Sequence, residues 1–146
     1  MGTRTALGPF VAEDSFLRHA DRKRHIRDGT VSPDVFWDNH QTLSFTYQDA
    51  GLRSEEGLDQ YQRDKELPHG DLPGLCKLTF HNLTVELQPG LSPRSDPVPQ
   101  DENYGHLHCC TDRPTDDVQR RRMAHLAERN GVVREFVPRR KRRGLA

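Results

Sequence analysis

The chain has 146 residues, of which 32% are hydrophobic and 30% are charged, and its 22 basic and 22 acidic side chains give a formal net charge of zero. This length predicts a single domain, and the low hydrophobic content predicts a small core within it. No apolar run approaches the ~20 residues that cross a bilayer, and residues 1–7 lack the apolar stretch of a secretory signal. We therefore expect a cytoplasmic protein with no membrane partner.

The first predicted elements are two helices. The segment before Gly29 predicts a helix that begins at Asp14 or Ser15, although most of its residues are polar. The pair Ser32-Pro33 is typical of a helix start, with Ser as the N-cap and Pro at the first helical position. This second, short helix would bury Phe36 and Trp37, so we assign both side chains to the core rather than to a stacking surface.

A strand and a helix follow. Residues 43–47 alternate between apolar and polar and are rich in strand formers, which predicts a strand. Ser54 is a suitable N-cap for a helix over residues 55–66. Gly57 weakens this helix by up to ~1 kcal/mol relative to alanine.

The apolar residues between 76 and 87 change parity. In an extended chain, one face would carry Cys76, Leu78 and Phe80. The opposite face would carry Leu83, Val85 and Leu87. A two-residue turn or a bulge at His81-Asn82 would return both sets to one core, so we expect a hairpin. Residues 88–103 contain four prolines and few apolar groups, which indicates a long loop.

The last elements are a strand and the most strongly marked helix. Residues 107–110 are expected to be a strand, and Thr115 is a suitable N-cap for a helix over residues 116–129 that ends at Asn130-Gly131. Residues 132–137 predict a closing edge strand. The helix carries a narrow apolar stripe of Met123, Ala124, Leu126 and Ala127.

Together these elements predict an α+β fold. We expect a small, mostly antiparallel or mixed sheet of three to five strands with two to four helices. The domain would span residues 13–137, between a frayed N-terminus at residues 1–12 and a basic, disordered tail at residues 138–146.

Histidine and cysteine gather between residues 104 and 110. In an extended segment three of these side chains face one way, His106, His108 and Cys110, while Leu107 and Cys109 face the other. The three are a candidate zinc site, to which Cys76 or His81 would add a fourth ligand, but the paired C-x-x-C spacing of zinc ribbons is absent. The alternative is a half-buried strand whose cysteines act as small hydrophobes, and on it we expect no cofactor.

The same segment also suits a metal-free hydrolase or transferase. His106 or His108 would be the general base, because imidazole titrates near neutral pH. Cys109 or Cys110 would be the nucleophile, and Asp112 would orient the base. No nucleophile elbow, P-loop or Gly-rich dinucleotide turn accompanies them.

The charges of the chain are unevenly distributed. Residues 113–146 contain 11 Arg or Lys and four acidic side chains, a balance of +7, so the preceding residues carry −7. Such an excess binds phosphates by releasing their counterions. The candidate nucleic-acid-binding residues are Arg120, Arg121, Arg122, Arg139, Arg140, Lys141, Arg142 and Arg143.

Two functions of different classes follow from these observations. The leading hypothesis is a small accessory protein that binds a partner protein or nucleic acid through its basic C-terminal region. Because no aromatic residue interrupts the basic run, we expect electrostatic contact rather than base recognition. The runner-up is a small enzyme centred on His106 and His108. A solubilising tail, or a tail that docks on the acidic body, is the alternative explanation for the basic run.

Overall fold

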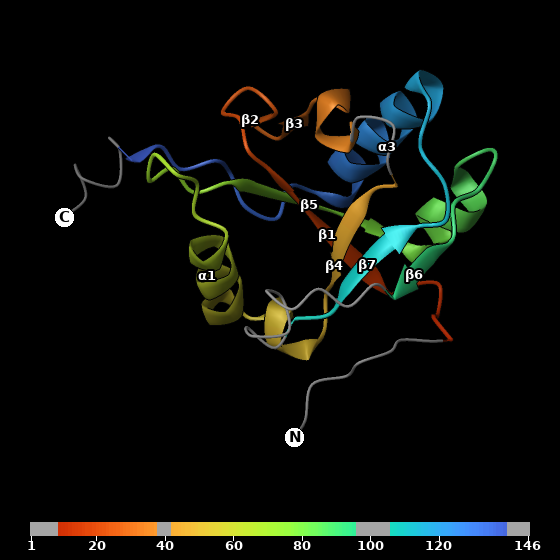
Figure 1. The fold of residues 1–146 in the computed structure, drawn as a ribbon, viewed down its shortest axis with the longest axis horizontal. Helices are drawn as coiled ribbons and strands as arrows, with labels where there is room; N and C mark the ends of the chain where they lie inside the picture. The colour runs from red at the N-terminus through yellow and green to blue at the C-terminus, as the bar shows by residue number, and fades with distance from the viewer. Residues whose placement is uncertain (1–8, 38–41, 96–105, 140–146) are drawn as a thin grey trace.

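A five-stranded antiparallel sheet organises the protein, whose computed structural model describes residues 9–37, 42–95 and 106–139 (Figure 1). The strand order is β5-β1-β4-β7-β6, and each recorded pairing is antiparallel. The strands are β1 (Ser15–Ala20), β4 (Ser44–Tyr47), β5 (Gly74–Thr79), β6 (Pro93–Ser95) and β7 (His108–Thr111). The predicted α+β class with a mostly antiparallel sheet is confirmed.

The remaining elements lie around this sheet. Two short strands, β2 (Ile26–Arg27) and β3 (Thr30–Val31), form a separate two-stranded sheet. The longer helices are α1 (Glu55–Asp64) and α3 (Asp117–Asn130). Shorter helical turns are η1 (Pro33–Phe36), η2 (Ala50–Arg53) and the π-helical turn η3 (Asn82–Glu86). None of the helices in the described ranges is long and apolar enough to span a membrane.

The prediction of a helix beginning at Asp14 or Ser15 is wrong, because this segment is the strand β1 between β5 and β4. Phe16 packs in the larger core cluster on one face of the sheet, and Leu17 packs in a second cluster on the other. A strand with both faces covered has adjacent apolar residues instead of a clean alternation. The pairing of β1 with two neighbours thus decided its conformation.

Two hydrophobic clusters cover the two faces of the sheet. The larger one joins Phe16, Phe45, Cys76 and Leu78 from the strands to the apolar stripe of α3. The smaller one consists of Leu17, Leu52, Leu58, Tyr61 and Leu75, so α1 and η2 lie on the opposite face from α3. Figure 1 shows the two helices well separated across the sheet.

Helix α3 matches its prediction with a shift of one residue at each end. Asp116, not Thr115, is the N-cap, and its carboxylate accepts a hydrogen bond from the Gln119 backbone N–H at 2.7 Å. The Gln119 side chain accepts from the Asp116 backbone in return, which completes a capping box. The helix ends at Asn130, and its C-cap is Gly131, whose φ of 90° favours glycine. All four residues of the predicted apolar stripe are buried.

The predicted hairpin around His81-Asn82 is wrong. After β5 the chain enters η3, because the Asn82 carboxamide accepts from the Thr79 backbone N–H and the Thr79 hydroxyl accepts from the Asn82 backbone N–H. The helical turn accounts for the change of parity, since Leu83 and Leu87 are buried while Val85 is exposed. Part of the predicted Pro-rich loop forms β6, and residues 96–103 lie outside the described residues.

The two ends of the described chain lie against the domain. Phe10 packs against the larger core cluster. Residues 132–137 lie along the outer edge of β5 through two isolated bridges, Leu72 with Val137 and Leu75 with Arg134, rather than as a continuous strand. The backbone N–H of Arg139 donates to the Asp71 carboxylate at 2.8 Å.

Candidate functional site

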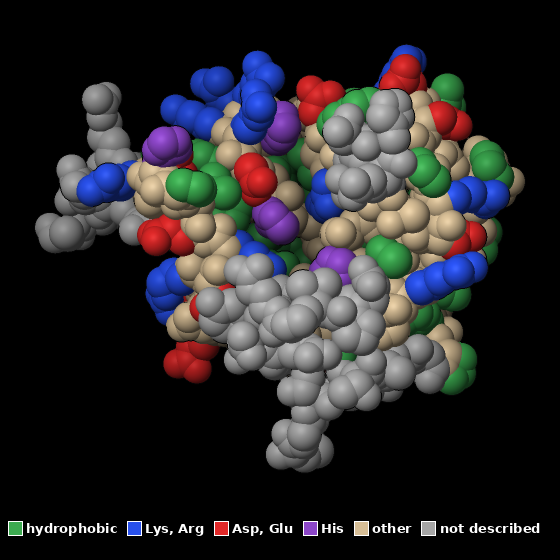
Figure 2. All heavy atoms as spheres, in the orientation of Figure 1, with side chains coloured by type: hydrophobic (Ala, Val, Ile, Leu, Met, Phe, Trp, Pro, Cys, Tyr) green, Lys and Arg blue, Asp and Glu red, His purple; other side chains and the backbone are tan. Residues whose placement is uncertain are grey.

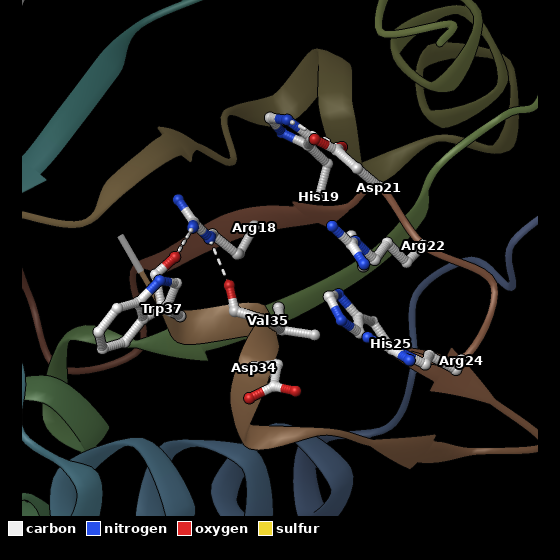
Figure 3. A pocket seen from close by; sticks show the side chains of 10 residues that line it. Arg18, His19, Asp21, Arg22, Arg24, His25, Asp34, Val35 and Trp37 are labelled. Atoms are coloured by element: carbon white, nitrogen blue, oxygen red, sulfur yellow. Dashed lines mark hydrogen bonds and ion pairs between the residues drawn. The ribbon is translucent and has the colours of Figure 1, made fainter. Parts of the chain in front are cut away.

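A cavity of about 480 Å³ opens where β1 leaves the sheet, and we call it the β1 cavity (Figure 3). Its walls are the end of β1, the turn between β1 and β2, and η1. The lining residues are Arg18, His19, Ala20, Asp21, Arg22, Arg24, His25, Asp34, Val35 and Trp37. In Figure 2 a hollow in this face of the molecule has histidine and Lys or Arg side chains at its edge.

The strand register explains why the cavity forms here. Strand β5 pairs with β1 as far as Ala20, which lies opposite Gly74. The recorded pairing with β4, in contrast, covers Phe16 and Leu17. Among the described residues, no β4 pairing is recorded for β1 beyond Leu17, and η1 borders the space on that side.

Arg18 holds this wall in place. Its guanidinium donates hydrogen bonds to three backbone carbonyls: Val35 at 2.9 Å, Ser44 at 3.0 Å and Trp37 at 3.3 Å. One planar group thus joins β1 to both η1 and β4, which a lysine ammonium with its single nitrogen would not reproduce. We interpret Arg18 as a positioning residue for the cavity.

Two further arginines supply positive charge that the described residues do not neutralise. Within those ranges, the guanidinium groups of Arg22 and Arg24 make no hydrogen bond and no ion pair. Of the two acidic side chains in the lining, Asp21 lies 3.5 Å from His19 Nε2. Arg22 and Arg24 are therefore suited to an anionic ligand.

His25 lies on the same side of the cavity as Arg22 (Figure 3). Burial lowers the pKa of His25 below its usual 6.5, and the nearby charges of Arg24 and Arg22 act in the same direction. The Asp34 carboxylate, which raises the pKa, does not offset them. The imidazole is therefore neutral at pH 7 and offers one N–H donor and one acceptor.

Trp37 forms the opposite side of the cavity (Figure 3). The prediction that its side chain lies in the core is wrong, because the side chain is 48% exposed. The guanidinium carbon of Arg120 lies 4.6 Å from the centre of the indole ring. The sequence contained a signal for this exposure: Phe36 and Trp37 are adjacent, and neighbouring helical residues do not share a face.

The structure places the predicted histidines on a different surface. His106 Nε2 is 3.6 Å from the Asp64 carboxylate, with side chains 12% and 11% exposed. The Tyr61 ring packs edge-on against the His106 imidazole, and the two ring centroids are 5.1 Å apart. The predicted orienting residue, Asp112, instead accepts a hydrogen bond from the Ser92 backbone N–H at 2.9 Å.

The cysteines divide between the two faces of the sheet. Cys109 is fully buried in the larger core cluster, while His108 and Cys110 are half-buried and, by the strand alternation, face the other way. Cys76 is also in the core, and burial raises the pKa of its thiol to about 12. It is thus separated from the candidate zinc ligands. In the described part of the chain no group of three His, Cys, Asp or Glu side chains is placed to hold a metal ion.

The basic C-terminal residues have different surroundings. Arg120 is almost buried, donates to the Thr115 carbonyl at 2.7 Å and pairs with Asp117, so it is engaged within the protein. Arg121 and Arg122 are exposed on α3. Arg139 is exposed at the end of the described chain, and the last four predicted contacts, Arg140, Lys141, Arg142 and Arg143, lie outside the described residues.

Comparisons with family models, with curated proteins and with solved structures found no match to this chain.

Proposed function

We propose that this protein binds single-stranded nucleic acid without catalysing a reaction, at a positively charged surface centred on the β1 cavity. The observation that carries the proposal is the combination of an exposed tryptophan, Trp37, with the guanidinium groups of Arg22 and Arg24 around one cavity. Proteins that bind single strands combine an aromatic ring, on which a base stacks, with cations that contact the phosphates.

The basic residues of α3 extend this surface. Arg121 and Arg122 are exposed and directly follow Arg120, whose guanidinium lies over Trp37. Because neighbouring helical residues do not share a face, Arg121 and Arg122 would contact phosphates further along the strand and not those next to the stacked base. The proposal therefore retains the α3 arginines of the sequence hypothesis and places the centre of the interface at the β1 cavity.

Fluorescence anisotropy with a labelled single strand and the matching duplex tests the proposal. The double variant Arg22→Ala/Arg24→Ala is expected to weaken single-strand binding about tenfold or more, since one hydrogen bond to a charged group is worth ~1.5–3 kcal/mol. The matched control, Arg53→Ala/Arg63→Ala, removes the same charge near α1 and is expected to change affinity less than about threefold. Equal losses in both double variants, or stronger binding of the duplex, would contradict the proposal.

A second candidate function is a small hydrolase that uses His106 as its general base. The observation in its favour is the poorly exposed pair of His106 and Asp64, because a carboxylate beside an imidazole orients the ring. Hydrolysis of simple aryl ester and aryl phosphate substrates tests it. Activity that survives in the His106→Gln variant at the wild-type rate excludes this candidate.

A further inference from the structure

We propose that the β1 cavity holds one nucleotide that carries a phosphate monoester, with the base stacked on Trp37 and the phosphate between Arg22 and His25. The inference rests on the proposed function and names the ligand class for the same site. It covers a free nucleoside monophosphate and the phosphorylated end of a strand, which share this chemistry.

The size of the cavity favours a single nucleotide. Its volume of about 480 Å³ is within the range of small-ligand sites, which are roughly 300–1,000 Å³. A duplex cannot present one base to such a cavity without extruding it from the stack, which costs free energy. One unpaired nucleotide is therefore the unit of nucleic acid that fits.

The distribution of groups around the cavity matches the two ends of a nucleotide. Figure 3 shows Trp37 on one side and Arg22 and His25 on the other. Ala20 and Val35, both buried, provide apolar lining. An aromatic wall and a basic wall on opposite sides of the cavity match the base and the phosphate of a nucleotide.

The charges around the cavity favour a monophosphate over longer phosphate chains. Arg22 and Arg24 carry two positive charges that the described residues do not neutralise, and a phosphate monoester carries about −1.5 to −2 at pH 7. Asp34 lines the same cavity and is close enough to His25 to influence its titration. Its carboxylate would repel the additional phosphates of a triphosphate.

The single tryptophan makes the site directly observable. The chain contains one Trp residue, so its intrinsic tryptophan fluorescence reports on Trp37 alone. Titrations with adenosine 5′-monophosphate, adenosine, ribose 5-phosphate and inorganic phosphate separate the contributions of base and phosphate. We expect saturable quenching by the monophosphate, and at least about tenfold weaker binding of each fragment and of adenosine triphosphate.

Two variants test the assigned roles. Arg22→Ala is expected to weaken the monophosphate about tenfold and to leave adenosine affinity within about twofold. Trp37→Leu, measured by calorimetry, is expected to weaken both adenosine and the monophosphate but not ribose 5-phosphate. Arg63→Ala serves as the control, and thermal melts establish that each variant is folded. An Arg22→Ala variant that binds the monophosphate as tightly as the wild type would overturn the inference.

Oligonucleotides distinguish the two sources of the phosphate and separate this inference from the proposed function. Single strands with a 5′-phosphate, a 3′-phosphate or neither are compared for affinity and for displacement by adenosine 5′-monophosphate. Tighter binding of one phosphorylated end, with displacement, supports a strand-end site. Monophosphate binding without binding of any strand supports a free-nucleotide site and rejects the proposed function. Strand binding that ignores the terminal phosphate and is not displaced overturns the inference and leaves the proposed function intact.

Discussion

Charged side chains near the β1 cavity differ in what they do, although the sequence presents them as similar. The Arg18 guanidinium donates hydrogen bonds to the carbonyls of Val35, Ser44 and Trp37, whereas the Arg22 guanidinium, four residues later, donates none within the described ranges. On α3, the Arg120 guanidinium donates to the Thr115 carbonyl, whereas the Arg121 side chain is exposed. The sequence identifies where arginines cluster, but only the fold determines which guanidinium groups remain for a ligand.

The lowered pKa of His25 makes stability depend on pH. Between its folded-state pKa and 6.5 the unfolded chain binds more protons than the folded chain, so the free energy of unfolding decreases as pH falls below 6.5. The charged groups that influence His25 are Asp34, Arg24, Arg22 and Asp21. Urea unfolding at pH 7.5 and 5.5 is expected to show a larger loss of stability for the wild type than for His25→Gln.

All other residues are the same in the two proteins, so their contributions to the pH dependence cancel in that comparison. Identical losses in the two proteins would mean that His25 has no lowered pKa. A ligand phosphate beside His25 would favour the protonated ring, so saturating adenosine 5′-monophosphate should reduce the difference between wild type and variant.

At the scale of elements, local signals predicted some segments well. The capping residues and apolar stripe of α3 lie within the element itself, and so does the alternation of residues 107–110. Strand β1 depends on partners far along the chain, since Phe16 lies opposite both Tyr47 and Leu78. The β1 cavity was missed for the same reason, because its walls come from β1, the following turn and η1, and it exists only after β1 is placed between β5 and β4.

Helix α1 gives a case in which propensity and structure disagree. Propensity predicts that Gly57→Ala stabilises the helix by up to ~1 kcal/mol. However, a Cβ atom at this position would lie 1.7 Å from the carbonyl oxygen of Gly51 in η2. We therefore expect Gly57→Ala to destabilise the protein by about 1–3 kcal/mol, as overpacking does.

Urea unfolding of Gly57→Ala beside Glu56→Ala provides the measurement. Glu56 is exposed in the same helical turn, and its replacement is expected to change stability by no more than about 0.5 kcal/mol. A stabilised Gly57→Ala protein would show that α1 and η2 do not approach each other this closely.

For the molecule as a whole, residues 132–137 connect parts that the sheet alone does not join. Arg134 pairs with Glu55 at 2.7 Å and with Asp59 at 3.2 Å, both on α1. The Glu135 carbonyl accepts from the Gln62 carboxamide, and the Glu135 carboxylate accepts from the Gly29 backbone N–H. The segment thus links α1, the edge of β5 and the β2–β3 turn.

Two truncations separate this segment from the basic run after it. Removal of residues 132–146 is expected to lower the thermal midpoint by more than about 5 °C, because several hydrogen bonds and two bridges are lost. Removal of residues 140–146 alone is expected to keep the midpoint within a few degrees, since four of these seven residues are charged and the run has one large apolar side chain, Leu145. Circular dichroism melts measure the thermal midpoints of the two truncated proteins. Equal midpoints would show that residues 132–137 do not stabilise the domain.

The position of α3 late in the chain has a consequence for biosynthesis. When the ribosome has released the strands up to β7, the face that carries Phe16, Phe45 and Leu78 is still partly uncovered, because the Met123 and Leu126 side chains that complete its cover have not yet emerged. An exposed apolar sheet face of this kind is prone to self-association during synthesis. The domain is therefore expected to complete its fold only after α3 emerges, and a nascent chain stalled before that point would be a substrate for chaperones.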